Sequence, residues 1–348
     1  MNKINILQLI TGLGMGGAEK VVLDLAKFTN KNEFNTYVVS MSKRDELYDD
    51  FIQNKINTIK LDKSNSFRDI ISLISSINKI IKEKNINIIH AHMTHSVIVA
   101  SILKILNPKL KVVYTSHNFN IGSKLREIIV WFLKPFRNID IVFSKNILKY
   151  FYKSHYKVIP NGVQIDKYNL NLEKNNKFTF INIGRLETQK NQKFLIKFTN
   201  KLKSKYDFEI HIVGHGYLNE ELENLIKENK LENHIKLLGL RNDIPELLNQ
   251  SHCLIMPSLW EGLPIVILEA GASSLPVLST PVGSIPSLLN KKNSYICELK
   301  NFVDNAEFII NDYETAKEKA NKLFKKINTI YSIDEIVKKH EQIYKDLT

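Results

Sequence analysis

Short apolar runs of strand length alternate with amphipathic helical stretches along nearly the whole chain. In the first half, the runs occupy residues 4–10, 37–41, 86–90, 112–115 and 139–143. A second series follows at residues 178–184, 208–213, 235–238, 253–256 and 276–278. Such alternation is typical of βαβ units, in which a helix connects each strand to the next parallel one. The sequence therefore predicts an α/β fold built on parallel sheets.

The two series of strands indicate two domains. A chain of 348 residues exceeds what one hydrophobic core usually supports, and a polar stretch at residues 166–177 separates the series. We predict one Rossmann-like domain over residues 1–165, a second over residues 166–330, and a helix at residues 331–348 that packs back on the first domain. Because parallel sheets bind ligands beyond the carboxyl ends of their strands, two such domains facing each other imply a cleft between them.

The composition restricts the partners and the compartment. The net charge of +13 attracts nucleic acid, anionic lipid or phosphorylated substrates without choosing among them, and many of the lysines simply solvate helix faces. Two cysteines, Cys253 and Cys297, cannot supply a disulfide framework or a four-ligand zinc site. With no signal-peptide pattern and no apolar stretch of membrane-spanning length, we expect a soluble, cytoplasmic protein.

A glycine-rich turn follows the first apolar run. Residues 12–17 satisfy the G-x-G-x-x-G pattern of dinucleotide sites and precede a helix expected to begin near Ala18. A dinucleotide site also needs an acid at the end of the second strand, and the run at residues 37–41 ends among serines instead. The turn is therefore a weak candidate for NAD. It remains a candidate for presenting backbone N–H groups to a phosphate, with a ligand-free tight turn as the alternative.

In the second series, two cations follow a strand that ends in glycine. Gly184 ends the run at residues 178–184, Arg185 follows it, and Lys190 lies five residues beyond Arg185, near the start of the next helix. A guanidinium, an ammonium and a helix amino terminus at one place predict a clamp for a diphosphate. The alternative is a surface loop with two unrelated cations.

The strongest local signal lies at residues 258–269. Gly262 permits a close backbone turn, and Pro264 suits the first position of a helix whose N–H groups would be open to a ligand. Glu261 precedes this helix, and Glu269 lies inside it among apolar residues. A buried acid needs a hydrogen-bond partner, such as a sugar or ribose hydroxyl. Helix capping by Glu261 and a salt bridge of Glu269 are the alternatives.

Taken together, these segments resemble glycosyltransferase family 4, which comprises retaining enzymes of the GT-B architecture. The resemblance covers essentially the whole chain in the right order. It is carried by Gly16-Gly17-Ala18-Glu19, Thr115-Ser116-His117, Ile159-Pro160-Asn161-Gly162-Val163, Gly184-Arg185-Leu186 with Lys190, and Glu261 with Glu269. It implies two Rossmann-like domains with parallel sheets facing an interdomain cleft, and transfer of a sugar from a nucleotide-diphosphate donor to an acceptor.

The resemblance also implies roles for residues of the second domain. Arg185 and Lys190 would hold the donor diphosphate. Glu269 would bind the ribose, and Glu261 would contact the donor sugar near the reacting carbon. The nucleobase would lie against the loop at residues 239–243. The remaining donor-binding residues implied in this way are Gly184, Gly239, Arg241, Gly262, Leu263 and Pro264.

In the first domain, Gly16 and Gly17 would let the backbone approach the phosphate and the acceptor. His117 would lie in the cleft beside the sugar, although a lone histidine after a strand is more often structural. The turn at Asn161-Gly162 would mark the hinge between the domains, and Asn161 would also contact the substrate or donor. Catalytic roles thus fall to His117, Glu261, Arg185 and Lys190 by resemblance.

We expect no metal and no other cofactor. No Asp-x-Asp sequence occurs in the chain, so the usual carboxylate pair for a divalent cation is missing. Preorganised positive groups stabilise the departing diphosphate best, and Arg185, Lys190 and helix dipoles can take the place of the metal.

The sequence thus predicts a hexosyl- or N-acetylhexosaminyl-transferase with a glycan or lipid-linked acceptor. By family resemblance, its pathway would be cell-envelope polysaccharide assembly, such as lipopolysaccharide or capsule. A sugar-nucleotide epimerase of the same architecture is one alternative, and an NAD-dependent dehydrogenase is a weaker one. A nucleic-acid partner is not expected, because no basic motif interleaved with aromatic residues is present.

One further segment suggests where the enzyme would encounter its acceptor. On a helical wheel of residues 123–137, one stripe is predicted to lie in the core, and it comprises Leu125, Ile128, Ile129, Phe132, Leu133 and Phe136. Val130 and Trp131 fall outside it, among Lys124, Arg126, Lys134 and Arg137. Apolar groups within a basic face are what an interfacial helix uses to enter lipid headgroups, so this face predicts contact with an anionic inner-membrane surface. Packing of Trp131 on a neighbouring helix is the alternative.

Overall fold

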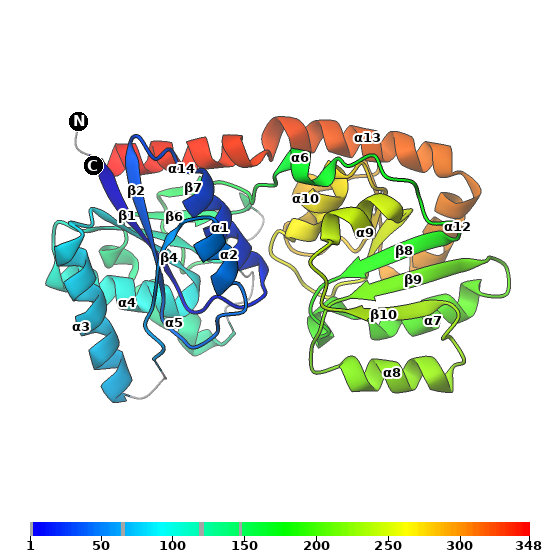
Figure 1. The fold of residues 1–348 in the computed structure, drawn as a ribbon, viewed down its shortest axis with the longest axis horizontal. Helices are drawn as coiled ribbons and strands as arrows, with labels where there is room; N and C mark the ends of the chain where they lie inside the picture. Colours follow the sequence, from blue (N-terminus) through cyan, green and yellow to red (C-terminus); the bar gives the residue numbers. More distant parts are fainter. Residues whose placement is uncertain (1–2, 64–66, 118–121, 146–147) are drawn as a thin grey trace. The chain divides into compact units, whose positions relative to one another are not determined.

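The computed structural model describes residues 3–63, 67–117, 122–145 and 148–348. The chain forms two compact units, the first made of Met1–Gly162 with Ile333–Thr348 and the second of Val163–Ser332. Each unit holds one sheet in which neighbouring strands run parallel. Helices connect the strands in both units (Figure 1). The predicted α/β class with two Rossmann-like domains is therefore confirmed.

The sheet of the first unit has the strand order β3-β2-β1-β4-β5-β6-β7. Its strands are β1 (Ile4–Ile10), β2 (Phe34–Ser40), β3 (Asn57–Lys60), β4 (Ile88–His92), β5 (Lys111–Thr115), β6 (Ile139–Val142) and β7 (Tyr156–Val158). The helices of this unit are α1 (Gly17–Phe28), α2 (Tyr48–Gln53), α3 (Phe67–Glu83), α4 (Met93–Leu106), α5 (Lys124–Phe132), the short 3-10 helix η1 (Lys134–Phe136) and α14 (Ile333–Leu347).

The two faces of this sheet are covered by different helices. On one face, Leu7, Leu9 and Ile89 belong to a large apolar core that includes residues of α3 and α4. On the other face, Ile6, Ile88 and Val113 pack with Ile336, Ile343 and Tyr344 of α14. This alternation follows from the strand period of two residues. The last helix of the chain thus completes the core of the first unit (Figure 1).

The second unit has the strand order β10-β9-β8-β11-β12-β13. Its strands are β8 (Phe178–Ile183), β9 (Phe208–Val213), β10 (Ile235–Gly239), β11 (Cys253–Met256), β12 (Val277–Ser279) and β13 (Tyr295–Ile296). Its helices are α6 (Ile165–Tyr168), η3 (Thr188–Lys190), α7 (Lys193–Leu202), α8 (Asn219–Glu228), α9 (Ile244–Gln250), α10 (Ile265–Ala272), α11 (Ile285–Leu288), η4 (Leu299–Asn301), α12 (Phe302–Asn311) and α13 (Tyr313–Ile330).

The chain passes between the units twice, after Gly162 and after Ser332. Within the second unit, Val163 N–H donates to the carbonyl of Tyr331 over 2.9 Å, and Val163 forms a bridge with Ser332. The two passages therefore lie side by side. The first lies a few residues before the predicted boundary at 165/166, so α6 belongs to the second unit.

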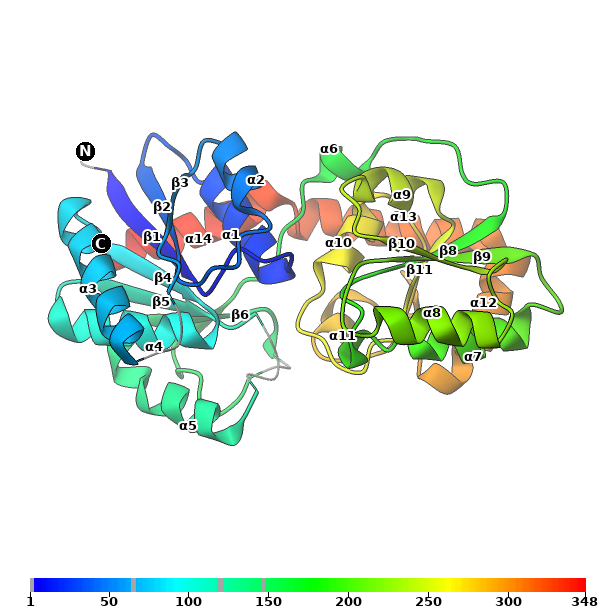
Figure 2. The same cartoon turned by 60° about the horizontal axis from the view of Figure 1, so that its bottom comes forward.

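Helix α5 corrects the predicted buried face of residues 123–137. Leu125 and Phe132 were predicted to lie in the core but are 66% and 65% exposed, whereas Val130 is fully buried. Ile128 and Trp131 are each 44% exposed. Figure 2 shows α5 at the periphery of its unit, where it contacts α4. A helical wheel identifies an apolar stripe but not the side on which a neighbour lies, and here the neighbour covers another stripe.

The cations of this segment also differ from the prediction. Arg137 is buried rather than solvated, and its Nη2 atom lies 3.1 Å from Oδ2 of Asp140. Nη2 also donates to the carbonyl of Phe151 over 2.8 Å. Nζ of Lys134 donates to the carbonyl of Tyr150. These two side chains therefore hold the end of the segment in place, while Lys124 and Arg126 are exposed.

Candidate active site

In the second unit, the loops after β8 and β11 meet where the strand order of the sheet reverses. β8 and β11 are adjacent and parallel, and open parallel sheets bind ligands at such a switch point. Leu259 N–H donates to the carbonyl of Gln189 over 2.9 Å. Nδ2 of Asn191 donates to the carbonyl of Pro257 over 3.1 Å. These bonds tie the two loops together at the carboxyl ends of the strands.

Lys190 and Glu261 form an ion pair across these two loops. Nζ of Lys190 lies 2.7 Å from Oε1 of Glu261, and the two side chains are only 18% and 5% exposed. Nε2 of Gln189 donates to the second carboxylate oxygen over 3.3 Å. A buried carboxylate requires such partners, because an uncompensated charge away from water is costly. The structure thus brings into direct contact two residues that were predicted to bind the sugar donor.

Gly184 leaves room for the stem of Lys190. A Cβ atom at Gly184 would lie 3.1 Å from Cε and 3.3 Å from Cδ of Lys190. A larger residue at this position would therefore crowd the lysine side chain. Arg185 is placed differently, because its side chain is 55% exposed and its Nη1 atom pairs with Oε1 of Glu187 over 3.0 Å. Such an exposed pair contributes little to stability, so the guanidinium can exchange its partner for an anion.

Helix α10 begins one residue later than predicted. Pro264 is the N-cap, with φ of −70° and ψ of 124°, rather than the first helical residue. Proline fixes only φ, and the peptide after Pro264 is still extended. Leu263 is buried, and the carbonyl of Gly262 accepts from Ser284 N–H over 3.0 Å. The amino end of this helix thus lies four residues after Glu261, at Ile265.

Glu269 lies on α10 and is 4% exposed. The hydroxyl of Tyr168, on α6, donates to its Oε1 atom over 2.6 Å. Such a charge-assisted bond fixes the orientation of the carboxylate. Tyr168 lies in the stretch that the sequence marks as a linker, so the linker contributes a residue to the site.

The loop after β10 contains two further predicted residues. Gly239 has φ of +65° and no atom within 4 Å of the position of a Cβ, so its backbone conformation rather than space favours glycine. Nε and Nη2 of Arg241 donate to the two carboxylate oxygens of Asp243 over 2.8 and 2.5 Å. This exposed fork holds the loop, and contact with a nucleobase stays a prediction.

In the first unit, the glycine-rich turn leads directly into α1. Gly16 is the N-cap with extended backbone, and α1 begins at Gly17, next to the predicted start near Ala18. A Cβ atom at Gly16 would lie 2.5 Å from Oε2 of Glu19. That carboxylate is the end of a flexible side chain, so it would only have to shift to make room. Phosphate or acceptor contact by Gly16 and Gly17 stays a prediction.

His117 follows β5 and belongs to a group of hydrogen-bonded polar side chains. Its Nε2 atom lies 2.9 Å from Nδ1 of His92. Nε2 of His92 lies 2.7 Å from Oε1 of Gln8, and Nε2 of Gln8 donates to the hydroxyl of Tyr344 over 3.3 Å. That hydroxyl lies 2.8 Å from Nδ1 of His90, whose Nε2 lies 2.8 Å from Oγ1 of Thr115. We call this series the relay, and its members are His117, His92, Gln8, Tyr344, His90 and Thr115.

Burial keeps the imidazole rings of this region neutral. It lowers the pKa of His117 to about 3 and the pKa of the neighbouring His340 to about 4. Burial is also the main cause that lowers the pKa values of His90 and His92 well below 6.5, with smaller contributions from the other histidines. The chemistry of this region is therefore that of neutral hydrogen-bonding groups.

The turn at Asn161-Gly162 lies at the boundary of the first unit. Asn161 is 5% exposed. A Cβ atom at Gly162 would lie 3.1 Å from Cα of Ile333 and equally close to Cγ1 of Ile336. The turn therefore passes close under the start of α14, and its role as a hinge stays a prediction.

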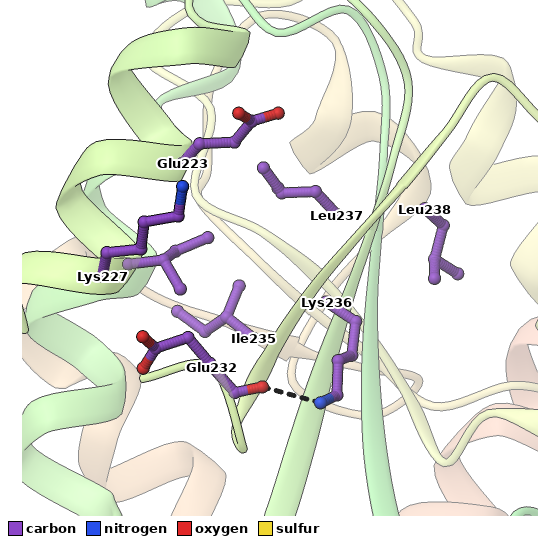
Figure 3. A pocket seen from close by; sticks show the side chains of 8 residues that line it. Glu223, Lys227, Glu232, Ile235, Lys236, Leu237 and Leu238 are labelled. Atoms are coloured by element: carbon purple, nitrogen blue, oxygen red, sulfur yellow. Dashed lines mark hydrogen bonds between the residues drawn. The ribbon is translucent and has the colours of Figure 1, made fainter. Parts of the chain in front are cut away.

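A shallow hollow in the second unit contains none of the predicted site residues. It lies beside α8 and β10 and is lined by Glu223, Ile226, Lys227, Glu232, Ile235, Lys236, Leu237 and Leu238 (Figure 3). Lys236 Nζ donates to the backbone carbonyl of Glu232 over 2.6 Å at its rim. The described residues include no cluster of three or more His, Cys, Asp or Glu side chains placed to hold a metal ion. Over the same residues, no helix is long and apolar enough to cross a membrane.

Sequence reasoning missed Gln8, His92, Tyr344, Tyr168 and Gln189. A usable signal existed for Gln8 and His92, because a polar side chain inside an apolar strand must find a partner when buried. The other three depend on which loops and helices meet in space. Nothing in their local sequence marks them.

The whole fold matches a known class of enzyme structure. The crystal structure of Anabaena Alr3699/HepE in complex with UDP-glucose superposes with a TM-score of 0.87 at 20% identity, over 99% of this chain and 100% of that one. This likeness concerns the fold, which is the GT-B architecture of two Rossmann-like domains.

Sequence comparison identifies the family. The model of "Glycosyltransferase Family 4" matches residues 15–167, and that of "Glycosyl transferases group 1" matches residues 165–328. The chain therefore belongs to the glycosyltransferases of the family 4 type, as the resemblance predicted.

Two curated relatives span most of the chain. The UDP-Gal:alpha-D-GlcNAc-diphosphoundecaprenol alpha-1,3-galactosyltransferase of Escherichia coli is 29% identical over 310 residues, which is 77% of this chain and 78% of that protein. The capsular polysaccharide biosynthesis glycosyltransferase CapH of Staphylococcus aureus is 27% identical over 302 residues, 80% of this chain and 82% of that protein.

Proposed function

We propose that this glycosyltransferase moves a hexosyl or N-acetylhexosaminyl group from a nucleoside diphosphate to an acceptor, retains the anomeric configuration, and uses no bound metal. The observation that carries the proposal is the Lys190–Glu261 pair at the switch point of the second sheet, 2.7 Å apart and largely buried. It places a cation and a carboxylate where a parallel sheet receives its ligand.

The donor in this proposal is a UDP-sugar. Its support is that the Escherichia coli relative is named for UDP-Gal and the Anabaena structure contains UDP-glucose. Glu269, held by Tyr168, would bind the ribose. The alternative bases are guanine and adenine, and thermal-shift measurements with UDP-, GDP- and ADP-sugars decide among them, since a ligand at a hundred times its Kd adds about 2.7 kcal/mol of stability.

The proposed chemistry places negative charge on the departing diphosphate. Lys190 and the exposed guanidinium of Arg185 would stabilise that charge, and Glu261 would act at the donor sugar. Once the diphosphate arrives, Lys190 would share its ammonium between the phosphate and Glu261. The pair would thus keep the cation in place before the donor binds, which lowers the cost of organising it during the reaction.

Three measurements test this function. Transfer should continue in excess chelator, and complete loss that magnesium or manganese restores would contradict metal independence. Proton NMR of fresh product should give the donor's anomeric configuration, whereas inversion would overturn retention. An epimerase would instead isomerise the sugar nucleotide in the absence of acceptor, so an acceptor-free control separates the two activities.

The proposed acceptor is a lipid-linked glycan of cell-envelope polysaccharide assembly, of the capsule or lipopolysaccharide kind. Its support is that one relative is named for a diphosphoundecaprenol acceptor and another for capsular polysaccharide. Such an acceptor lies at a membrane surface, so the enzyme would work as a peripheral membrane protein on the inner face.

Helix α5 offers the surface for that contact. Leu125, Ile128, Trp131 and Phe132 are exposed on it together, and Lys124 and Arg126 lie among them. Apolar side chains bordered by cations suit the interface of an anionic bilayer. Each cation near such a surface adds about 1 kcal/mol of attraction.

Co-sedimentation with vesicles tests the contact. Wild type should pellet with anionic vesicles at low salt and less with neutral ones. The double variant Leu125→Ser with Phe132→Ser should stay in the supernatant. Ile105→Ser with Leu106→Ser is the matched control, because these side chains at the end of α4 are 57% and 55% exposed. Equal pelleting of a folded α5 variant would exclude this helix as the membrane contact.

A further inference from the structure

The relay joins the predicted sugar-side residue His117 to the last helix of the chain. Its inner members, Gln8, His90, His92 and Tyr344, are each completely buried. His117 is half-buried, and within the described residues its only hydrogen bond is the one from Nε2 to His92. One end of the relay is therefore fixed in the core, and at the other end Nδ1 of His117 has no hydrogen-bond partner among the residues that the structure describes.

The register of the sheet explains why these side chains meet. Gln8 of β1 is opposite His90 of β4, and His92 is opposite Thr115 of β5. Side chains two residues apart share a face of the sheet, so Gln8, His90 and His92 all point toward the side that α14 covers. Tyr344 supplies the hydroxyl that joins Gln8 to His90.

The amide of Gln8 sets the direction of every bond on the way to His117. Its Oε1 atom, 2.7 Å from Nε2 of His92, can only accept, so that nitrogen carries the proton. The ring of His92 is neutral, so its Nδ1 has a lone pair and accepts from His117. Nε2 of His117 is therefore the protonated nitrogen, and Nδ1 carries the lone pair.

The same reasoning assigns the donors and acceptors between Gln8 and Thr115. Nε2 of Gln8 donates to the hydroxyl of Tyr344, which leaves that hydroxyl free to donate to Nδ1 of His90 over 2.8 Å. Nε2 of His90 then donates to Oγ1 of Thr115. Donors and acceptors thus match along the whole relay, and Tyr344 holds the amide of Gln8 in the orientation on which the rest depends.

We propose that Gln8, His92 and Tyr344 are positioning residues that hold His117 in the neutral tautomer protonated at Nε2, so that Nδ1 faces the site as a hydrogen-bond acceptor. A sugar hydroxyl would donate to that nitrogen. The other tautomer, or an imidazolium, would present an N–H group and could not accept the hydroxyl proton. The choice of tautomer therefore decides which polar atom of the sugar His117 can bind.

This inference rests on the proposed function for its ligand, but the tautomer can be measured without turnover. In protein labelled with ¹⁵N-histidine, long-range proton–nitrogen NMR spectra should show His117 protonated at Nε2 and bare at Nδ1. Gln8→Leu should give a mixture of the two tautomers. Tyr344→Phe should give a smaller change in the same direction, because it acts through Gln8.

His340→Gln is the matched control. His340 lies in the same cluster, with its ring centroid 5.7 Å from that of His90, but its Nδ1 atom bonds to the carbonyl of Ile336, outside the relay. The His117 signals should therefore be unchanged in this variant. A wild-type His117 protonated at Nδ1, or unchanged His117 signals in folded Gln8→Leu, would overturn the proposal. If Gln8→Leu does not fold, Tyr344→Phe decides by the same criterion.

Kinetics gives the second readout. Gln8→Leu should lower kcat/KM about 10- to 100-fold, by analogy with the loss seen when the partner that orients a metal-bound histidine is removed. The affinity for UDP alone should not change, because no relay residue belongs to the unit that holds Lys190 and Glu269. If wild type transfers no sugar while the tautomer behaves as described, the proposed function fails and the positioning role stands.

Discussion

The first six strands of each unit follow the same order in the sheet, but the two units place opposite kinds of chemistry at the ends of their strands. In the first unit, buried imidazoles, an amide and hydroxyls form a relay of neutral groups. In the second, a buried ammonium–carboxylate pair and a buried carboxylate held by a tyrosine lie near the switch point. Neutral hydrogen-bonding groups suit sugar hydroxyls, whereas fixed charges suit a diphosphate. Under the proposed function, the diphosphate would therefore bind to the second unit and the sugar hydroxyls would meet the polar groups of the first.

Removing the charge of the second unit should have the largest effect. We expect Lys190→Ala to lower kcat about 10²- to 10³-fold, as when one preorganised stabilising group is lost. Lys193→Ala is the matched control, since Lys193 pairs with Glu221 on an exposed surface, and its kcat should remain near wild type. Steady-state kinetics with saturating UDP-sugar measures both. An unchanged kcat in Lys190→Ala would show that the charge of this unit is not used in transfer.

Acid should destabilise the first unit more than the second. His90, His92, His117 and His340 all have folded-state pKa values depressed by burial. Above pH about 6.5, these histidines are neutral in both the folded and the unfolded protein. Below that pH, they become protonated in the unfolded chain but stay neutral in the folded one. Each such histidine therefore costs up to about 1.4 kcal/mol of stability per pH unit as the pH falls from about 6.5 toward 4.

Hydrogen exchange followed by mass spectrometry measures this effect unit by unit. The second unit has one histidine, His252, whose pKa is similarly lowered, to about 4, chiefly by burial. Between pH 7.5 and 5, amide protection should thus fall further in β1, β4 and β5 than in β8 and β11, after correction for the intrinsic rates. His340→Gln should reduce the difference. Equal losses in both units would contradict the account of neutral, buried rings.

The smallest expected effect concerns the hydroxyl of Tyr168. Its bond to Glu269 spans 2.6 Å, and a hydrogen bond to a charged group contributes about 1.5–3 kcal/mol. Because water can replace part of this in the variant, we expect Tyr168→Phe to weaken UDP binding about tenfold or less. Isothermal titration calorimetry compares it with Tyr313→Phe, whose hydroxyl bonds to the carbonyl of His252. Equal affinity of both variants would remove Tyr168 from the ribose site.

Much of the fold could be predicted because it depends on local periodicity. The strand-length apolar runs and the helical spacing between them predict two parallel sheets, although they do not give the order of the strands within each sheet. Residues fixed by short motifs, such as Gly184, Lys190 and Glu261, were identified for the same reason. They lie on two loops whose meeting follows from the sheet order.

What could not be predicted depends on packing between distant segments. The buried side of α5 is set by the position of α4, which no helical wheel contains. Tyr344 lies 336 residues from its partner Gln8, and Tyr168 lies 101 residues from Glu269. The start of α10 lies one residue later than predicted, with Pro264 as the N-cap. This could not be predicted because proline restricts φ but leaves ψ open.

The double passage of the chain has a consequence for synthesis on the ribosome. Domains fold as they emerge, the amino-terminal ones first, yet the core of the first unit includes Ile336, Ile343 and Tyr344 from the last helix. Residues 163–332 are complete before that helix appears. The nascent chain can therefore finish its second unit first, while the relay, and with it the orientation of His117, is assembled only after residue 344 has been translated.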